Sequence, residues 1–504
     1  MSSKKIKLSS DQEKAMKLLK SGKNVFITGE AGTGKSTLIN EFRKYLDGNE
    51  IKYIACAPTG VAAININGAT LHHTFGAPIG FIDENKCDQW KKSIDVVQEA
   101  KVIIIDEVSM CRYDLFDYVT TYINQMCPGE QWCSGKQLVV VGDFSQLPPI
   151  ISKKEKPFFH GKGGFAFQGR TWEKCRFRTV YLHKIMRQND EDFIRALNEA
   201  RLGNAQCVEY FNRLVSPYDQ ENAVTLCSRN AEADEINNER LEDLEGPGRH
   251  YIADFTGDAK KSDFNGVEDL VLKKGARVMA IANDIEGHKY ANGSMGVVSR
   301  LGYDTVSVKW DNGEKSDVKA FKWTKHEYSV TETEVTEEVF DEKTGAVKTK
   351  KRIRKDIGMK PTGTIVQIPL KLGYAITIHK SQGNTFSAVN VDITGVFQEG
   401  QAYVALSRCS TPEGLHLKQK VWAGDFKANA EINAFYDRCE REEAVIERQE
   451  LEAEAIREAK RKGLSENNIL YVDEEIADKI RKAADSKHIS VSDYLRTIVS
   501  ITHD

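Results

Sequence analysis

Residues 24–37 read NVFITGEAGTGKST and decide the fold class of this chain. The run from Asn24 to Thr28 predicts a short buried strand. A glycine-rich loop follows at once, and the apolar spacing beyond it, through Leu38 and Phe42, predicts a helix. A strand, a loop of the form GxxxxGKS and a helix in this order predict a phosphate-binding loop within an α/β domain.

The residues of this loop are suited to binding a nucleoside triphosphate. Glycines at 29, 32 and 34 let backbone amides curl around the phosphates, and the helix N-terminus adds partial positive charge. Lys35 is expected to reach the β and γ phosphates, and Ser36 to offer its hydroxyl to Mg²⁺. ATP and Mg²⁺ are therefore the expected cofactors.

A second apolar strand supplies the carboxylates that such a site needs. It reads VIIID and ends at Asp106, the expected metal-side carboxylate, with Glu107 beside it to orient or deprotonate the attacking water. The alternative is a surface Asp-Glu pair after a strand. Because two motifs in the right order rarely coincide, the phosphate loop favours the catalytic interpretation.

A third strand opens the segment VVVGDFSQLPPI, residues 139–150. Asp143 and Gln146 follow it, where a parallel sheet presents its carboxyl edge to ligands. Gln146 is therefore expected to touch a γ-phosphate and to relay its state. Taken alone, the segment also fits a strand followed by a Pro-Pro loop without chemistry.

Three further polar residues are candidates for the nucleotide site. Gln12 lies in an expected capped helix start, where it either reads the adenine edge or is a solvated helix glutamine. Arg187 and Arg408 lie far along a chain that has no second phosphate loop, and a guanidinium from a second domain can stabilise a transferred phosphoryl group. Taken singly, each arginine fits a surface salt bridge better than a catalytic role.

Length and composition bound the class of protein. A chain of 504 residues predicts three or four domains. The 71 Lys and Arg residues nearly balance the 74 Asp and Glu residues, so nucleic acid would have to bind in a local groove. The ten cysteines show no C-x-x-C pair, and no run of about 18 apolar residues occurs. We therefore expect reduced thiols, no membrane contact and an intracellular, cytoplasmic location.

The chain resembles superfamily-one DNA helicases of the RecD, Dda and PIF-type branch, and is nearest the PIF type, over roughly residues 8–426. In the first half the resemblance rests on the Gln12 segment and on GEAGTGKST (29–37), APTGVAA (57–63), GATLHHTFG (68–76), IIIDEVSM (103–110) and GDFSQLPPI (142–150). In the second half it rests on LHKIMRQNDEDFIRALNEARLG (182–203), NGSMGVV (292–298), IPLKLGYAITIHKSQGNTF (368–386) and GQAYVALSRC (400–409). A phosphate-loop switch or kinase would not need the HKSQG and ALSR motifs. A nucleic-acid-binding regulator built around the C-terminal module would explain only the last forty residues.

The resemblance implies an α/β fold with two RecA-like parallel-sheet motor domains, a small SH3-like β-barrel insertion and a ribbon-helix-helix-like tail. The expected segments are motor domain 1 (1–180), motor domain 2 (181–301 and 365–426), the β insertion (302–364), a charged helical linker (427–463) and the tail module (464–504). It also implies an ATP-dependent helicase that moves 5′-to-3′ on single-stranded DNA and unwinds forked or tailed duplexes in replication, recombination or repair.

The resemblance also assigns site residues. The expected catalytic residues are Lys35, Glu107, Gln146, Arg187 and Arg408, with Ser36 and Asp106 on the metal. The expected nucleotide-binding residues are Gln12, Gly29, Ala31, Gly32, Thr33, Gly34, Lys35, Ser36, Thr37 and Gly383. The expected DNA-binding residues are Pro58, Thr59, Gly60, His72, Phe75, Thr377, His379 and Lys380. Gln382 is grouped with this second set, and the histidines also fit buried, hydrogen-bonded imidazoles.

Two insertions carry open alternatives. In residues 76–101 the family places a strand-separating wedge, for which Phe81 and Trp90 are the aromatic candidates unless they are core residues. In the β insertion, Asp311-Asn-Gly313 predicts a hairpin turn between strands 306–310 and 318–323. Acidic residues 332–341 and basic residues 348–355 are expected to pair around a turn at 342–345, as a solvated ribbon or as a DNA-touching strand.

The end of the chain predicts helices. Residues 428–462 are rich in Glu, Arg and Ala and free of Gly and Pro, which predicts a helical spacer. Residues 468–499 then resemble a ribbon-helix-helix module whose strand is almost wholly apolar. Self-association or docking of a protein partner is favoured there over operator binding, and a plain helical hairpin is the alternative.

Overall fold

In the computed structural model the chain divides into two compact units, Met1–Tyr436 and Asp437–Asp504. The structure describes residues 8–78, 80–82, 94–127, 132–133, 135–216, 220, 223–284, 287–341, 346–393, 396 and 398–461. Within these ranges no helix combines the length and the apolar character needed to cross a bilayer.

The first unit contains a six-stranded sheet in which every pairing is parallel. Its order is β3 (Ala69–Thr70), β2 (Tyr53–Ala57), β4 (Val102–Ile105), β5 (Gln137–Val141), β1 (Val25–Gly29) and β6 (Arg178–Leu182). The helices of this part are α1 (Ser10–Lys20), α2 (Lys35–Gly48), α3 (Gly60–Asn65), α4 (Leu71–Phe75), α5 (Ile94–Glu99) and α6 (Tyr113–Met126). The strands β1, β4 and β5 are wholly buried, as expected for a parallel sheet.

A second parallel sheet has four strands. Its order is β18 (Ala375–Thr377), β7 (Val224–Cys227), β19 (Val389–Val391) and β20 (Leu415–Leu417), and its helices are α7 (Glu191–Leu202), α8 (Cys207–Asn212), α9 (Asn230–Glu242) and α10 (Gln401–Leu406). The chain is thus a mixed α/β protein with two parallel-sheet cores. The expected boundary at residue 181 is wrong, because it cuts β6, which pairs with β1 as far as Leu182.

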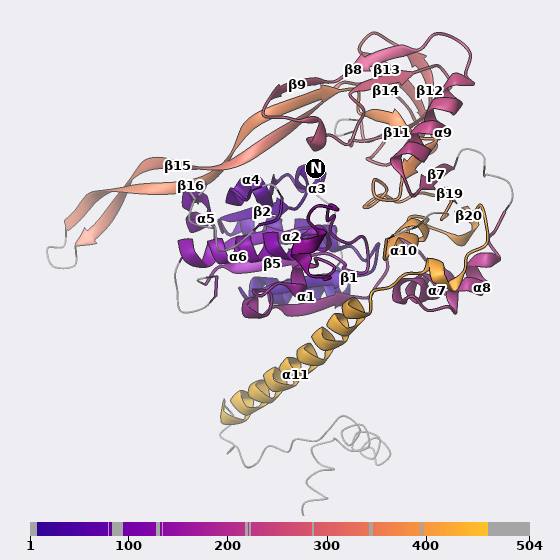
Figure 1. The fold of residues 1–504 in the computed structure, drawn as a ribbon. Helices are drawn as coiled ribbons and strands as arrows, with labels where there is room; N and C mark the ends of the chain where they lie inside the picture. The colour runs from indigo at the N-terminus through magenta and orange to yellow at the C-terminus, as the bar shows by residue number, and fades with distance from the viewer. Residues whose placement is uncertain are drawn as a thin grey trace, which may run out of the picture. The chain divides into compact units, whose positions relative to one another are not determined.

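Along the sequence, a series of mostly antiparallel strands, β8 to β17, lies between β7 and the other strands of the second parallel sheet, and Figure 1 shows these strands as a separate β-rich region. A five-stranded sheet runs β14 (Lys315–Lys319), β13 (Thr305–Trp310), β12 (Met295–Leu301), β11 (Arg277–Ala280) and β17 (Leu370–Leu372), and β8 (Arg249–Ile252) pairs with β10 (Asp269–Leu272). The β-rich segment therefore extends from residue 249 to 372, beyond the expected 302–364. The expected turn at Gly313 is confirmed. The strand after it was expected at 318–323 but is β14, which begins at Lys315. The start of β14 is polar, so hydrophobic alternation does not mark it in the sequence.

The acidic and basic segments do pair, as part of a long ribbon of β15 (Phe321–Asp341) and β16 (Ala346–Gln367), with β9 (Asp254–Gly257) alongside β16. Lys355 Nζ lies 3.2 Å from Glu332 Oε1, in the expected register. The base of the ribbon is not freely solvated. The Tyr328 hydroxyl accepts from Ala55 N (2.8 Å) and donates to Ala55 O (3.1 Å) on β2, and the ribbon crosses α4 and α5 (Figure 1).

The last described helix, α11 (Ala430–Arg461), confirms the expected helical stretch. Its first turns are not a spacer, however, because Ile432, Phe435 and Tyr436 are buried within the first unit. The ribbon-helix-helix prediction (468–499) and the turn at 342–345 lie outside the described residues.

Candidate functional site

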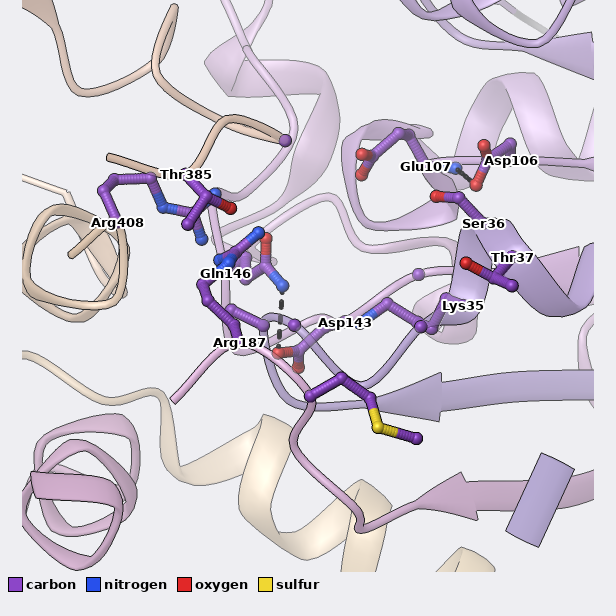
Figure 2. A pocket seen from close by; sticks show the side chains of 16 residues that line it. Lys35, Ser36, Thr37, Asp106, Glu107, Asp143, Gln146, Arg187, Thr385 and Arg408 are labelled. Atoms are coloured by element: carbon purple, nitrogen blue, oxygen red, sulfur yellow. Dashed lines mark hydrogen bonds between the residues drawn. The ribbon is translucent and has the colours of Figure 1, made fainter. Parts of the chain in front are cut away.

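A cavity of about 520 Å³ opens where the phosphate loop meets residues from the second parallel sheet (Figure 2). Its lining residues are Ala31, Gly32, Gly34, Lys35, Ser36, Thr37, Asp106, Glu107, Gly142, Asp143, Gln146, Met186, Arg187, Gly383, Thr385 and Arg408. All five expected catalytic residues and both expected metal ligands are among them. The geometry therefore collects residues that lie more than 370 positions apart in the sequence.

The phosphate loop is shaped by close backbone approaches. Gly32 has φ +85°, and a Cβ there would lie 2.5 Å from Arg187 Cβ. The Lys35 ammonium donates to the carbonyl oxygens of Gly29 (2.7 Å) and Glu30 (2.9 Å). Burial lowers the Lys35 pKa. The nearby anions Asp143 and Glu107 oppose that shift, and the phosphates of a nucleotide would do the same.

Two expected nucleotide contacts support the loop instead of lining the cavity. A Cβ on Gly29 would meet Leu182 O at 2.4 Å, so this glycine allows β6 to approach. The Thr33 hydroxyl donates back to Glu30 O at 2.9 Å. Both residues fix the loop conformation, and neither is among the residues that line the cavity.

Gln12 is not a solvated helix residue, since it is buried against the phosphate loop. Its Nε2 donates to Thr33 O and Gly34 O, both at 3.3 Å, and its Oε1 accepts from Ser9 N at 3.0 Å. Ser9 Oγ in turn accepts from Gln12 N, which completes a capping box at the start of α1. Gln12 therefore couples this helix to the loop.

The two carboxylates after β4 are half-buried at the edge of the cavity. Asp106 Oδ1 accepts from Glu107 N at 2.9 Å, and Glu107 holds a left-handed backbone at φ +50° (Figure 2). Burial raises the pKa of Glu107 to about 7, with a further contribution from Asp106. A carboxylate with such a pKa is matched to proton abstraction near neutral pH. A Ser36 hydroxyl and an Asp106 carboxylate are also the oxygen donors that Mg²⁺ takes beside phosphates.

Gln382 contacts two polar residues that line the cavity, Glu107 and Gln146. Its Nε2 lies 3.3 Å from Glu107 Oε2 and 3.5 Å from Gln146 Oε1. The sequence interpretation grouped Gln382 with the DNA-binding residues, and the structure places it at the nucleotide site. Its position next to Gly383, an expected nucleotide contact, was the available signal.

The two arginines reach the cavity from different elements (Figure 2). Arg187 follows β6 of the first sheet and donates from Nη1 to Ser407 O at 3.2 Å. Arg408 follows α10, is fully buried, and donates from Nε to Val404 O at 2.9 Å. Burial and the neighbouring Arg187 lower its pKa to about 9. Arg187 therefore lies on the connection between the two sheets and contacts the second one through Ser407.

The expected DNA contacts of the first sheet fall into two groups. Thr59 caps α3 by accepting from Ala62 N at 3.3 Å, and Gly60 packs against Asp263 in the 3-10 helix Lys261–Asp263. Pro58 and His72 are half-buried, and burial lowers the His72 pKa. The expectation for Phe75 is wrong, since its ring is buried edge-on against Tyr122 of α6 and cannot stack on a base.

The second set surrounds the end of β18. Lys380 is exposed, and its backbone N–H donates to the hydroxyl of the buried Thr377 at 3.3 Å. His379 is half-buried, and burial lowers its pKa. Thr377 therefore shapes the turn that presents Lys380, whose exposed ammonium is free to meet an anionic backbone.

Of the two wedge candidates, Trp90 lies outside the described residues. The ring of Phe81 stacks on Phe158 with centroids 5.0 Å apart and contacts Phe159 edge-on at 5.4 Å. Phe158 is 52% exposed. Phe81 is thus neither an isolated surface ring nor a core residue, but part of a half-exposed aromatic pair.

The fold and the cavity define a phosphate-loop protein whose nucleotide site is completed by a second parallel-sheet core, and comparisons with known proteins agree. The family profile described as PIF1-like helicase matches residues 7–209. The ATP-dependent DNA helicase Pif1 of Bdellovibrio bacteriovorus is 30% identical over 82% of this chain and 88% of its own length. The crystal structure of a Bacteroides Pif1 with ADP-AlF4 superimposes with a TM-score of 0.74 at 30% identity, covering 87% of this chain and 98% of that one.

The chain belongs to the PIF1-like helicase family. It spans 66% of the length of the Xenopus laevis relative, to which it is 32% identical over 88% of its own length.

Proposed function

We propose that this protein is an ATP-dependent DNA helicase that moves 5′-to-3′ along single-stranded DNA. The observation that carries the proposal is the contact of Gln382 with both Glu107 and Gln146, which joins the second parallel sheet to the hydrolytic residues of the first. A phosphate-loop switch or kinase has no need of such a bridge. The polarity rests on family membership, and the bridge supports the motor activity.

In the proposed reaction, Glu107 takes a proton from water as the water oxygen bonds to the γ-phosphorus. The bond from that phosphorus to the bridging oxygen breaks, and ADP leaves with the electron pair. Lys35, Arg187 and Arg408 balance the charge that develops on the phosphoryl oxygens. A bound Mg²⁺, held by Ser36 and Asp106, supplies Lewis-acid stabilisation of the same oxygens.

We infer that nucleotide-dependent closure moves the two parallel-sheet cores relative to one another. Closure would carry Pro58, Thr59, Gly60 and His72 toward Thr377, His379 and Lys380, and hydrolysis would reverse the movement. Alternating grip by two such sets converts an ATP cycle into steps along one strand. Gln146 lines the cavity and contacts Gln382, so it is the residue proposed to transmit the state of the nucleotide to the DNA-binding loops.

Single-stranded and forked DNA are the proposed partners. A Bacteroides Pif1 structure with a TM-score of 0.60 to this chain holds single-stranded DNA with ADP-AlF3, and a Pif1 structure with a TM-score of 0.59 concerns DNA unwinding at forked double-stranded DNA. The Phe81 and Phe158 pair is the proposed wedge, because a rigid half-exposed aromatic surface can stack on the last base pair ahead of the motor. Self-association through residues 464–504 remains a proposal about the tail.

The test is ATP turnover with and without single-stranded DNA, followed by unwinding of 5′-tailed and 3′-tailed duplexes. Stimulated turnover and unwinding of the 5′-tailed substrate alone are expected. Lys35→Ala, which removes the phosphate-binding ammonium, is the control for contaminating ATPase. Turnover that ignores DNA would overturn the helicase assignment, whereas unwinding of the 3′-tailed duplex would overturn only the polarity.

A further inference from the structure

The start of α11 returns to the first parallel sheet after the chain has completed the second one. Ile432, Phe435 and Tyr436 are buried there. The Phe435 ring stacks on Phe167 with centroids 4.2 Å apart and meets Phe144 edge-on at 5.6 Å. Residues near position 435 therefore complete the aromatic core beside β1 and β5.

Tyr436 adds a polar contact to this packing. Its hydroxyl accepts from Phe144 N at 2.8 Å, donates to Asp143 Oδ1 at 3.1 Å and lies 3.1 Å from Thr28 Oγ1. The hydroxyl thus meets the ends of β1 and β5, where the phosphate loop and the Gln146 loop begin. A buried hydroxyl with these partners fixes the relative position of two backbone segments.

Asp143 lies at the centre of the same network. Its Oδ1 also accepts from Arg201 Nη2 (3.0 Å) and Ser145 N (3.1 Å), while its Oδ2 accepts from Gln146 Nε2 (3.3 Å; Figure 2). Burial alone would raise the Asp143 pKa, but Arg201 and Lys35 outweigh it and the pKa is lowered. The carboxylate therefore stays charged and holds the Gln146 amide.

We propose that Tyr436 is a positioning residue for the DNA stimulation of ATP turnover, acting through Asp143 to orient Gln146 toward Gln382. The path consists of three side-chain hydrogen bonds, which join Tyr436 to Asp143, Asp143 to Gln146, and Gln146 to Gln382. This inference rests on the proposed helicase function. By this inference, the start of α11 takes part in coupling DNA binding to ATP turnover, although it lies beyond the motifs shared with the helicase family.

Packing and positioning can be separated because neighbouring residues perform them. Phe435 supplies ring contacts only, because its side chain has no polar atom that could bond to Asp143. Tyr436→Phe keeps the ring and removes the hydroxyl. Phe435→Leu keeps the hydroxyl network and removes aromatic packing, so it is the matched control.

The experiment measures kcat and KM for ATP with and without saturating single-stranded DNA, the Kd for that DNA and the Tm, all on the full chain. For Tyr436→Phe we expect the DNA-stimulated kcat to fall about tenfold, the scale of one hydrogen bond to a charged group. The basal kcat, the KM for ATP and the DNA Kd should stay within about twofold. For Phe435→Leu the Tm should fall while the ratio of stimulated to basal turnover is kept.

Two results would overturn the inference. One is wild-type stimulation in Tyr436→Phe. The other is an equal loss of the stimulation ratio in both variants, which would show that packing alone matters. Wild-type protein that DNA does not stimulate would instead refute the proposed helicase function, so the two failures are distinct.

Discussion

The side-chain amide of Gln382 donates to the carboxylate of Glu107 across 3.3 Å, although 275 residues separate them. This contact crosses from the turn after β18 to the loop after β4. Because Gln382 also reaches Gln146, the expected base and the expected sensor share one partner. In the proposed mechanism this amide would link turnover to movement of the second sheet.

The pH dependence of turnover should report Glu107. Its pKa is about 7 in the folded protein, and the base must be deprotonated, so kcat/KM should rise with pH through about 7 and fall about tenfold per unit below it. Steady-state ATPase assays from pH 5.5 to 8.5 check this. Glu107→Gln should lower kcat by a factor of about 10² to 10⁴ and abolish this limb. If Glu107→Gln kept the same rise of kcat/KM with pH, the titrating group would be a residue other than Glu107.

Arg408 should contribute to the transition state and little to nucleotide binding. Removing a guanidinium that stabilises a transferred phosphoryl group costs about 10³ to 10⁵ in rate. We expect Arg408→Ala to show this loss in kcat while retaining affinity for a fluorescent ATP analogue. Arg195→Ala, an exposed arginine on α7, should match wild type. A loss confined to nucleotide affinity would contradict the assignment.

Gln146→Ala should uncouple DNA binding from turnover. The variant loses contacts to Asp143 and Gln382 but leaves the expected DNA-facing residues in place. Stimulation of ATPase by single-stranded DNA should fall by about tenfold, with DNA affinity nearly unchanged. Fluorescence anisotropy and ATPase assays on the same samples make the comparison, and equal loss of both quantities would count against a relay.

Tyr328 should stabilise the contact between the ribbon and the first sheet. Tyr328→Phe removes the hydroxyl that serves both backbone groups of Ala55, at a cost of about 1 to 3 kcal/mol in unfolding free energy. Urea denaturation measures this cost, and hydrogen exchange at Ala55 should accelerate. Tyr303→Phe, at a residue that is 92% exposed, provides the control and should leave both measurements unchanged.

Lys371 should destabilise the folded state near neutral pH. Burial, with a contribution from Lys380, lowers its pKa from 10.5 to about 7, and its ammonium nitrogen has no hydrogen-bond partner within the described part of the chain. Between these values the unfolded state binds more protons, so stability rises with pH by up to about 1.4 kcal/mol per unit. Lys371→Met should therefore raise Tm at pH 7.5, and the gain should shrink toward pH 10. A gain that is constant with pH would contradict this linkage.

The local chemistry of the nucleotide site was predictable from the sequence. The strand before the loop and the helix from Lys35 appear within one residue of the expectation, because hydrophobic periodicity and glycine placement act over short distances. Asp106 and Glu107 follow from the same logic at the end of a buried strand. The pairing of the acidic and basic strands was likewise encoded, since opposite charges facing across a ribbon fix its register.

Tertiary packing decided the rest. Phe75 reads as an aromatic in a DNA-facing motif, yet α6 covers it, and burial of the ring depends on that distant helix. Tyr436 gives no local sign of its contact with Asp143, and for Gln382 the only local sign is its position next to Gly383. Their contacts with Asp143 and Glu107 arise only when separate strands end at one sheet edge. The sequence by itself determined the phosphate loop and its carboxylates through local periodicity. Only the folded arrangement of two sheets and the returning helix decided which distant side chains complete the site.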